Sequence, residues 1–286
     1  MRLPRGSVGE SLLTLFVRLC TYAAIALLLL TLGLLLWEGG SVVDWQFLTS
    51  AWQHREITQG GIAQAIIGSM LLGVGVMLFS FPVGIATSVF MTEYSRYGRW
   101  KRIVQLAIRN LAGVPSVVYG LFGLAVFVYA LDFGMSLLSA VLTLSIMTLP
   151  WIITASVEAL ESVPRTFRES SLALGASPSQ TIVRVVLPAA LPGSITGGVI
   201  GVARALGETA PLIMVGATFY LSTLPRSPFD RFMALPYHTF ILATQHSSPQ
   251  ALSYAAGSAL VLIALTFFLT FGAMLLRYRF RMRKDW

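Results

Sequence analysis

Two charged side chains, Arg204 and Glu208, interrupt an otherwise apolar stretch at residues 199–217, VIGVARALGETAPLIMVGA. A charged side chain at the centre of a bilayer costs about 2.5–3.5 kcal/mol on insertion scales. A guanidinium group offers five donors in a planar fork that fits an oxyanion in a two-point contact. In a helix, the spacing of four would place both side chains on one face, close enough to pair. We therefore interpret Arg204 and Glu208 as a candidate contact site for an anion on a transmembrane pathway.

The pair is also open to a structural interpretation, as a salt bridge within the chain or to another subunit. Pairing lowers the cost of burying two charges but does not usually reverse it, so stability alone is a weak reason for their position. On the functional interpretation, Glu208 either holds the guanidinium in place or competes with the passing anion, which favours release. Pro211 removes a backbone hydrogen bond to Gly207 and predicts a kink in one continuous helix, with Gly207 and Thr209 supporting the pathway.

The composition is that of an integral membrane protein. Of the 286 residues, 56% are hydrophobic and 11% are charged, whereas a soluble domain is about 25% charged. The single cysteine, Cys20, excludes an intramolecular disulfide. The net charge of +8 does not indicate a nucleic-acid partner, because the basic residues flank apolar segments, where membrane topology explains them.

Six segments have the length of about 20 mostly apolar residues that a membrane span requires. They are residues 14–37, 62–90, 110–131, 137–157, 191–219 and 252–276. We therefore predict an all-α, polytopic membrane protein with six transmembrane helices. We divide the chain into residues 1–61, which hold the first helix and an outer loop, and residues 62–286, which hold a five-helix core.

Lysine and arginine set the orientation. Most of the 20 Lys and Arg residues fall in segments that lie on one side if the N-terminus is inside. This bias places both termini in the cytoplasm of a multi-pass protein of the cell (inner or plasma) membrane. The inner cluster from Arg96 to Arg102 is interpreted as a topology and lipid-headgroup patch rather than a binding site. Asn110 and Tyr119 are either polar contacts of a pathway or partners of neighbouring backbone groups.

An inner loop at about 158–187 is predicted to form two short helices joined by a sharp turn. Pro164 would open the first helix, and Gly175 suits the left-handed residue that follows its end. Ser177 would cap a second short helix, which Pro188 would end. A compact unit of this kind, which we call the knob, can transmit a movement from a partner subunit, whereas a flexible linker cannot.

The same loop resembles the EAA loop of ABC-importer permeases. The matching residues are Glu169, Ser170, Ser171, Leu174, Gly175 and Ala176, followed by Ile182 and Leu187-Pro188. Serines stand where the family pattern has two alanines. The resemblance implies that these residues couple the chain to a cytoplasmic ATPase. The chain has no G-x-x-x-x-G-K-[ST] phosphate-binding loop, so we expect no cofactor bound by this chain and ATP used by a partner subunit.

Three other stretches resemble the phosphate-specific members of that family, the PstA-type subunits. They are ARALGETAPL at residues 203–212, LAGVPSVVYGLFGL at residues 111–124 and FMALPYHTFILAT at residues 232–244. Permeases for sulfate and molybdate match the first stretch as far as Gly-Glu but commonly continue with Phe-Gly. The resemblance implies the type I ABC importer permease fold and a subunit that forms half of a pathway for inorganic phosphate.

The resemblance also implies the partners. These are a related permease subunit (PstC-like), two cytoplasmic ATPase subunits (PstB-like) and an extracytoplasmic phosphate-binding protein (PstS-like), with membrane lipid around the chain and no nucleic acid. The alternatives are an importer of another oxyanion (sulfate, molybdate or tungstate), a secondary anion transporter that needs no ATPase, and a membrane scaffold that transports nothing.

An outer loop at about 220–250 combines aromatic residues, prolines and charges, which predicts a short helix at the membrane interface. It is either a docking surface for a partner or a connector without a specific role. The three histidines, His54, His238 and His246, lack the spacing of a metal motif and are expected to be solvated or interfacial.

Overall fold

The computed structural model describes residues 8–53, 60–94, 98–221, 223–245 and 248–281, and these are mostly helical. His54 and His246 lie outside the described residues. The α-helices are α1 (Val8–Gly39), α2 (Trp45–Thr49), α3 (Ala63–Val89), α4 (Arg99–Ala112), α5 (Ser116–Gly123), α6 (Leu137–Glu161), α7 (Arg165–Ala173), α8 (Pro178–Thr181), α9 (Leu187–Leu206), α10 (Ala210–Val215), α11 (Leu235–Thr244) and α12 (Ala251–Arg281). Three π-helical segments, η2 (Phe90–Tyr94), η3 (Leu124–Ala130) and η4 (Ile182–Val186), continue α3, α5 and α8.

Within the described residues, five helices are long and apolar enough to cross a membrane, or six if one bent pair counts as a span. The five are Leu12–Gly39, Ala63–Tyr94, Leu137–Glu161, Pro178–Leu206 and Ala251–Arg279. The all-α, polytopic prediction is confirmed. Two of the six predicted spans nevertheless differ from the structure, at residues 110–131 and at residues 191–219.

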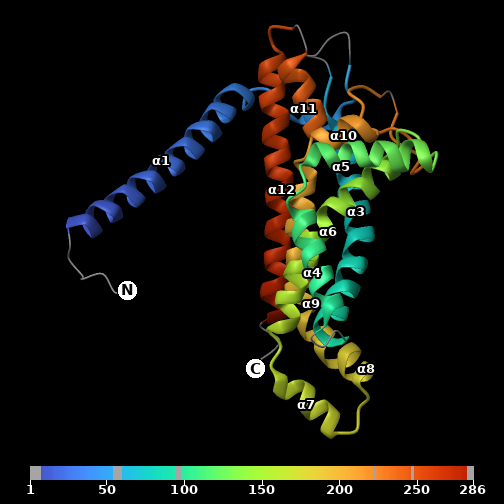
Figure 1. Ribbon diagram of the computed structural model, residues 1–286. Coiled ribbons are helices and arrows are strands. Elements are labelled where there is room, and N and C mark those ends of the chain that lie inside the picture. The colour runs from blue at the N-terminus through green and yellow to red at the C-terminus, as the bar shows by residue number, and fades with distance from the viewer. Residues whose placement is uncertain (1–7, 54–59, 95–97, 222, 246–247, 282–286) are drawn as a thin grey trace.

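The predicted span at residues 110–131 is two helices rather than one. Pro115 caps α5, and the residue before a proline disfavours helical backbone. The preceding helix α4 therefore ends at Ala112, and the two helices meet at an angle of 101°. In Figure 1, α5 lies across one end of the bundle, whereas α4 runs along it.

The predicted span at residues 191–219 begins and ends earlier in the structure. Pro188 does not end the preceding helix, because η4 carries the chain smoothly into α9. In this π-helical turn the Leu187 N–H donates to the carbonyl of Ile182, five residues back, and the widened turn admits the proline that follows. The result is one helix from Pro178 to Leu206.

Helices α3, α6 and α9 form the centre of the bundle (Figure 1). Small residues allow their close approach, as at Gly84 of α3 against Ile152 and at Gly197 of α9 against Ala155, where an added methyl group would clash. The largest buried cluster joins α3, α6 and α9 to α5 and α10 and includes Leu72, Leu144 and Leu206. These contacts fix the end of α9 against the rest of the bundle.

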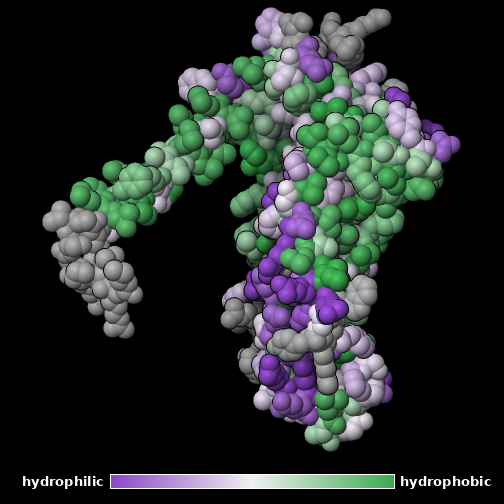
Figure 2. Space-filling view, in the orientation of Figure 1, coloured by the Kyte–Doolittle hydropathy of each residue, from purple (hydrophilic) through white to green (hydrophobic). Residues whose placement is uncertain are grey.

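Helix α1 stands apart from the bundle (Figure 1). It reaches α12 near its C-terminal end, where Gly39 packs against the backbone of Ala256 and Gly257. Its apolar side chains are exposed along its length, and Figure 2 shows the described part of the helix as mostly hydrophobic surface. Such a surface requires a lipid or protein environment.

The outer-loop helix is buried rather than interfacial. In α11, Leu235, His238 and Leu242 are buried, and the Leu235 N–H donates to Ser69 Oγ of α3 at 2.9 Å. The expectation for His238 is wrong, because its ring is fully buried and lies 4.6 Å from the ring of Trp52, centroid to centroid. Aromatic packing decides the position of this histidine.

Candidate functional site

The segment that carries Arg204 and Glu208 is a break between two helices. Helix α9 ends at Leu206, and the N–H groups of Gly207 and Glu208 close its last turn on the carbonyls of Arg204 and Ala205, both at 3.1 Å. Glu208 and Thr209 are not helical, and Pro211 lies in the first turn of α10. A proline there needs no N–H partner, so it starts a new helix instead of kinking a continuous one.

This break corrects two predictions about the charged pair. Arg204 and Glu208 do not share a helical face, and the ion pair expected between them is absent from the described residues, whose one ion pair is formed elsewhere. The guanidinium carbon of Arg204 instead lies 4.5 Å from the centroid of the Trp151 ring on α6. This cation–π contact orients the guanidinium and leaves its N–H donors available.

Arg204 is an exposed side chain in the isolated chain, and Glu208 is half-buried. The positive group lies in the last turn of a helix of 29 residues that is apolar enough to span a membrane. Because a cation at such depth requires water, an anion or a protein partner, its exposed position marks a surface that faces a cavity or another subunit. A guanidinium has the planar fork of N–H donors that fits an oxyanion in a two-point contact.

The second candidate site is the knob made by α7 and α8, which protrudes from one end of the bundle (Figure 1). The predicted first helix and the sharp turn after it are confirmed, whereas the second helix is not short, because it continues into α9. Pro164 precedes α7, Gly175 has a left-handed φ of 85°, and Ser177 caps α8. Ser177 and Gln180 form a capping box, in which the Gln180 N–H donates to Ser177 Oγ at 3.3 Å and the Ser177 N–H donates to Gln180 Oε1 at 2.9 Å.

Hydrogen bonds across the turn hold the knob in one shape. Ser171 and Thr181 join α7 to α8 through their hydroxyl groups at 2.9 Å, and the Ala176 N–H donates to the Ser171 carbonyl at 3.2 Å. Leu174 is 89% exposed at the end of α7, and Glu169 and Ser170 are exposed on the same helix. A rigid turn that presents an uncovered leucine is suited to docking in a groove of a partner.

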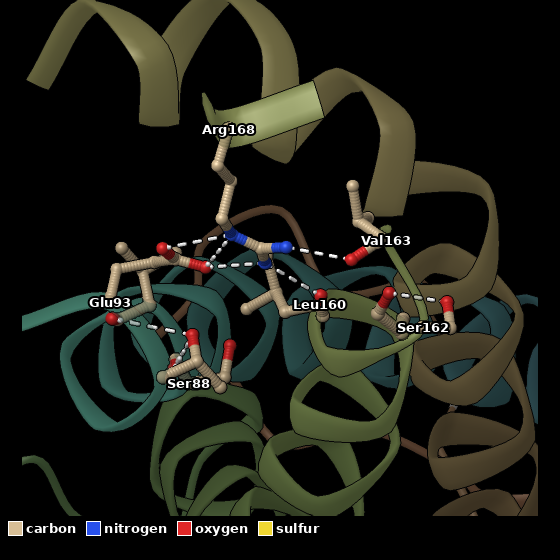
Figure 3. Close-up of polar contacts among 9 residues, drawn as sticks. Ser88, Glu93, Leu160, Ser162, Val163 and Arg168 are labelled. Atoms are coloured by element: carbon tan, nitrogen blue, oxygen red, sulfur yellow. Dashed lines mark hydrogen bonds and ion pairs between the residues drawn. The ribbon is translucent and has the colours of Figure 1, made fainter. Parts of the chain in front are cut away.

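Arg168 attaches the knob to the membrane helices (Figure 3). Its Nη2 donates to Glu93 Oε1 at 2.7 Å and to the Leu160 carbonyl at 3.0 Å, and its Nη1 donates to the Val163 carbonyl at 2.7 Å. Its Nε also donates to Glu93 at 3.2 Å. One side chain thus joins α7 to η2, at the end of α3, and to the last turn of α6. We call this set of contacts the Arg168 clamp.

The sequence interpretation missed Arg168 and Glu93. They lie 75 residues apart, and the available signal was weak, a basic and an acidic residue near the inner ends of predicted helices. The other predicted residues of the loop, Leu174, Gly175 and Ala176, lie together at the exposed turn.

The sequence matches the family described as "Binding-protein-dependent transport system inner membrane component" over residues 80–284. It is 35% identical to "Phosphate transport system permease protein PstA 2" of Mycobacterium bovis, over 85% of this chain and 79% of the relative. It is 34% identical to "Phosphate transport system permease protein PstA 1" of Mycobacterium tuberculosis, over 77% of this chain and 71% of the relative.

Two solved structures share the fold. One is the MetNI methionine ABC transporter in an inward-facing conformation, with a TM-score of 0.60, 19% identity, and coverage of 77% of this chain and 94% of the other. The other is a bacterial alginate ABC transporter in complex with its pentasaccharide-bound periplasmic protein. There the TM-score is 0.63 and the identity is 16%, with 92% of each chain covered.

Proposed function

The chain belongs to the family of binding-protein-dependent transport system inner membrane components, and from this premise we propose that it is a permease subunit of an ATP-driven importer of inorganic phosphate. The observation that carries this proposal is the exposed guanidinium of Arg204, held over Trp151 at the end of a membrane-spanning helix. The relatives named for phosphate transport support the choice of anion. Arg204 contacts phosphate in transit, and Glu208 limits how tightly the anion is held.

The chain is a non-catalytic membrane subunit, and ATP is hydrolysed by a separate ATPase. Importers of this family work with ATPase and substrate-binding partners. In our proposal these are two cytoplasmic ATPase subunits, an extracytoplasmic phosphate-binding protein and a related permease subunit that completes a heterodimer. The chain itself binds no cofactor. Both termini lie in the cytoplasm, and in Figure 1 the C-terminal end of α12 is at the same end of the bundle as the knob.

The pathway runs between the two permease subunits, each of which contributes half of its wall. The core at residues 62–286 supplies this wall, and residues 1–61 supply a helix that flanks it. The break at Gly207 and Thr209, followed by Pro211, keeps Arg204 at the surface of the core. A second subunit facing this surface would enclose the guanidinium in a pathway through which phosphate passes.

ATP-driven closure of the ATPase pair moves the knob, and the knob moves the helices that carry the pathway. Leu174 seats in a groove of the ATPase. Glu169 and Ser170 flank it on α7, while Ser171, Gly175 and Ala176 keep the turn closed. The proposed cycle is alternating access, in which the pathway opens outward to receive phosphate from the binding protein and then inward to release it.

Gly175→Val is expected to uncouple ATP hydrolysis from uptake. The strain comes from the backbone and not from crowding, because φ is 85° and a Cβ atom at this position would have no neighbour within 4 Å. A non-glycine residue in this conformation costs about 1–2 kcal/mol, and more for a β-branched one. We expect the turn to open and phosphate-stimulated ATPase activity to fall about tenfold, the factor that corresponds to about 1.4 kcal/mol. Gly175→Asn is the control, since asparagine tolerates this conformation. Normal coupling in the valine variant would contradict the role of the turn.

Uptake of radiolabelled phosphate by the complete complex in proteoliposomes tests the proposed function. We expect uptake that requires ATP on the side of the membrane where the ATPase subunits lie. Excess sulfate, molybdate or tungstate should not reduce this uptake. If one of these oxyanions inhibits uptake at a lower concentration than unlabelled phosphate does, that oxyanion, and not phosphate, is the substrate. Uptake without the ATPase subunits would favour a secondary transporter, and no uptake of any oxyanion would favour a scaffold.

A further inference from the structure

Helix α4 carries a line of polar side chains along one face. Arg102, Gln105 and Arg109 are spaced by three and four residues, which aligns them in a helix, whereas Ala107 lies on a different face. Arg102 and Arg109 are exposed and Gln105 is half-buried. We call these three residues the α4 stripe. Figure 2 shows hydrophilic surface over this part of the molecule, next to hydrophobic surface.

The stripe rises from the knob end of the bundle into its apolar part. Helix α4 follows η2, whose Glu93 belongs to the Arg168 clamp, and so begins at that end. At its other end, Tyr119 Oη donates to the Leu111 carbonyl at 2.8 Å, which settles the role of Tyr119 as a partner of the backbone. Tyr119 is buried in the same cluster as Leu144, which lies about 26 Å along α6 from Glu161 at a rise of 1.5 Å per residue.

Arg109 is therefore too deep for a lipid headgroup. It lies about 15 Å along the helix axis from Arg99, close to half the thickness of a hydrocarbon core of about 30 Å. A cation in the last turn of a helix gains about 0.3–1 kcal/mol from the helix dipole. That is less than the cost of about 2.5–3.5 kcal/mol for arginine in the middle of a bilayer. The position of Arg109 must be stabilised by something else.

The described part of the chain supplies no carboxylate for the stripe. Neither Arg102 nor Arg109 forms an ion pair with a carboxylate of the described residues within 4.0 Å. An exposed cation at the depth of Arg109 requires water and anions beside it. Their separation of about 10 Å along the axis suits an anion that is passed from one to the next and held tightly by neither.

We propose that the α4 stripe lines the inner half of the anion pathway and binds free inorganic phosphate between the level of Arg204 and the knob end of the bundle. This inference rests on the proposed function and adds residues that the sequence interpretation assigned to topology or left open. The same cations would also fit the phosphate of a lipid headgroup, and the depth of Arg109 decides for the free anion.

Cysteine labelling of the complete complex tests which face of α4 meets water. The chain has one cysteine, Cys20, so a Cys20→Ser background allows single-site labelling. Arg102→Cys and Arg109→Cys should react with a negatively charged, membrane-impermeant methanethiosulfonate, and inorganic phosphate should slow both reactions. Ala107→Cys is the matched control on the same helix and should stay unlabelled. Equal labelling at the three positions, or no labelling at Arg102 and Arg109, would overturn the inference.

Transport kinetics give the second test. Arg109→Gln should raise the KM for phosphate uptake about tenfold, the effect of losing one charge-assisted contact, while Arg109→Lys should restore most of it. Arg184→Gln, which removes an exposed charge from η4, should leave the KM unchanged. An unchanged KM in the Arg109→Gln variant, beside normal uptake by the wild type, would contradict this inference alone. A wild-type complex that imports no phosphate would contradict the proposed function instead.

Vesicles of different composition separate free phosphate from lipid. The tests are repeated in phosphatidylcholine alone and with phosphatidylglycerol added. If the stripe binds free phosphate, the labelling rates and the KM should be the same in both kinds of vesicle. Phosphate should also slow the labelling of the introduced cysteines in both. If phosphatidylglycerol slows the labelling of these cysteines and phosphate does not, the stripe is a lipid-headgroup site, and the inference is overturned.

Discussion

Replacing Arg168 with glutamine is expected to abolish phosphate uptake and phosphate-stimulated ATP hydrolysis, while the complex still assembles. The guanidinium of Arg168 donates to four acceptor atoms at once, the two carboxylate oxygens of Glu93 and the carbonyl oxygens of Leu160 and Val163. The side chains of Arg168 and Glu93 are only 21% and 12% exposed. A hydrogen bond to a charged group contributes about 1.5–3 kcal/mol, and here the loss of these bonds would detach α7 from both α6 and η2.

Matched variants separate the clamp from a general loss of charge. Arg165→Gln removes an exposed arginine from the same helix and should leave uptake intact. Glu93→Gln should reproduce most of the defect, and the double variant should be no worse than Arg168→Gln, because both members act through one contact. Uptake and ATPase activity are measured in proteoliposomes, with gel filtration to check assembly. Normal coupling in Arg168→Gln would show that α7 transmits motion without this attachment.

Replacing Arg204 with glutamine is expected to lower the rate of phosphate uptake at least about 100-fold, the effect of losing a two-point, charge-assisted contact. Arg204→Lys should retain part of the activity, since it keeps the charge but not the planar fork. Trp151→Leu should have a smaller effect of about severalfold, because the ring only orients the guanidinium at 4.5 Å. The readout is initial-rate uptake beside basal ATPase activity, which should not change.

Glu208→Gln distinguishes the two roles suggested for the carboxylate. If Glu208 competes with the anion, this variant should bind phosphate more tightly and release it more slowly, with a lower KM and a lower maximal rate. If Glu208 positions the guanidinium, it should raise the KM as the Arg204 variants do. Full transport by Arg204→Gln would refute the pathway role of this site.

The sequence predicted well those features that depend on local rules. The presence of long apolar helices follows from runs of apolar residues, and the turn of the knob follows from a proline, a left-handed glycine and a capping serine within a few residues. Each of these residues acts on its own neighbours, so no knowledge of the tertiary structure is required.

The predictions that were wrong concern features that depend on contacts between distant segments. Pro211 was interpreted as a kink because nothing local distinguishes a bent helix from a new one; in the structure Leu206 and Leu212, on either side of the break, both pack into the largest buried cluster. His238 was assigned to the interface by composition, whereas packing against Trp52 buries it. The Arg168 clamp joins residues that no short pattern relates. Tertiary contacts of this kind override the local pattern.

The continuous helix from Pro178 to Leu206 has the knob at one end and, at the other, the break that follows the turn with Arg204. At 1.5 Å per residue its 29 residues measure about 43 Å. If the helix pivots at the knob, each degree of tilt displaces the far end by about 0.8 Å, given that length. A small rotation that an ATPase imposes on the knob would therefore displace the far end of the helix by a distance comparable to the size of the transported anion, because no hinge interrupts the helix.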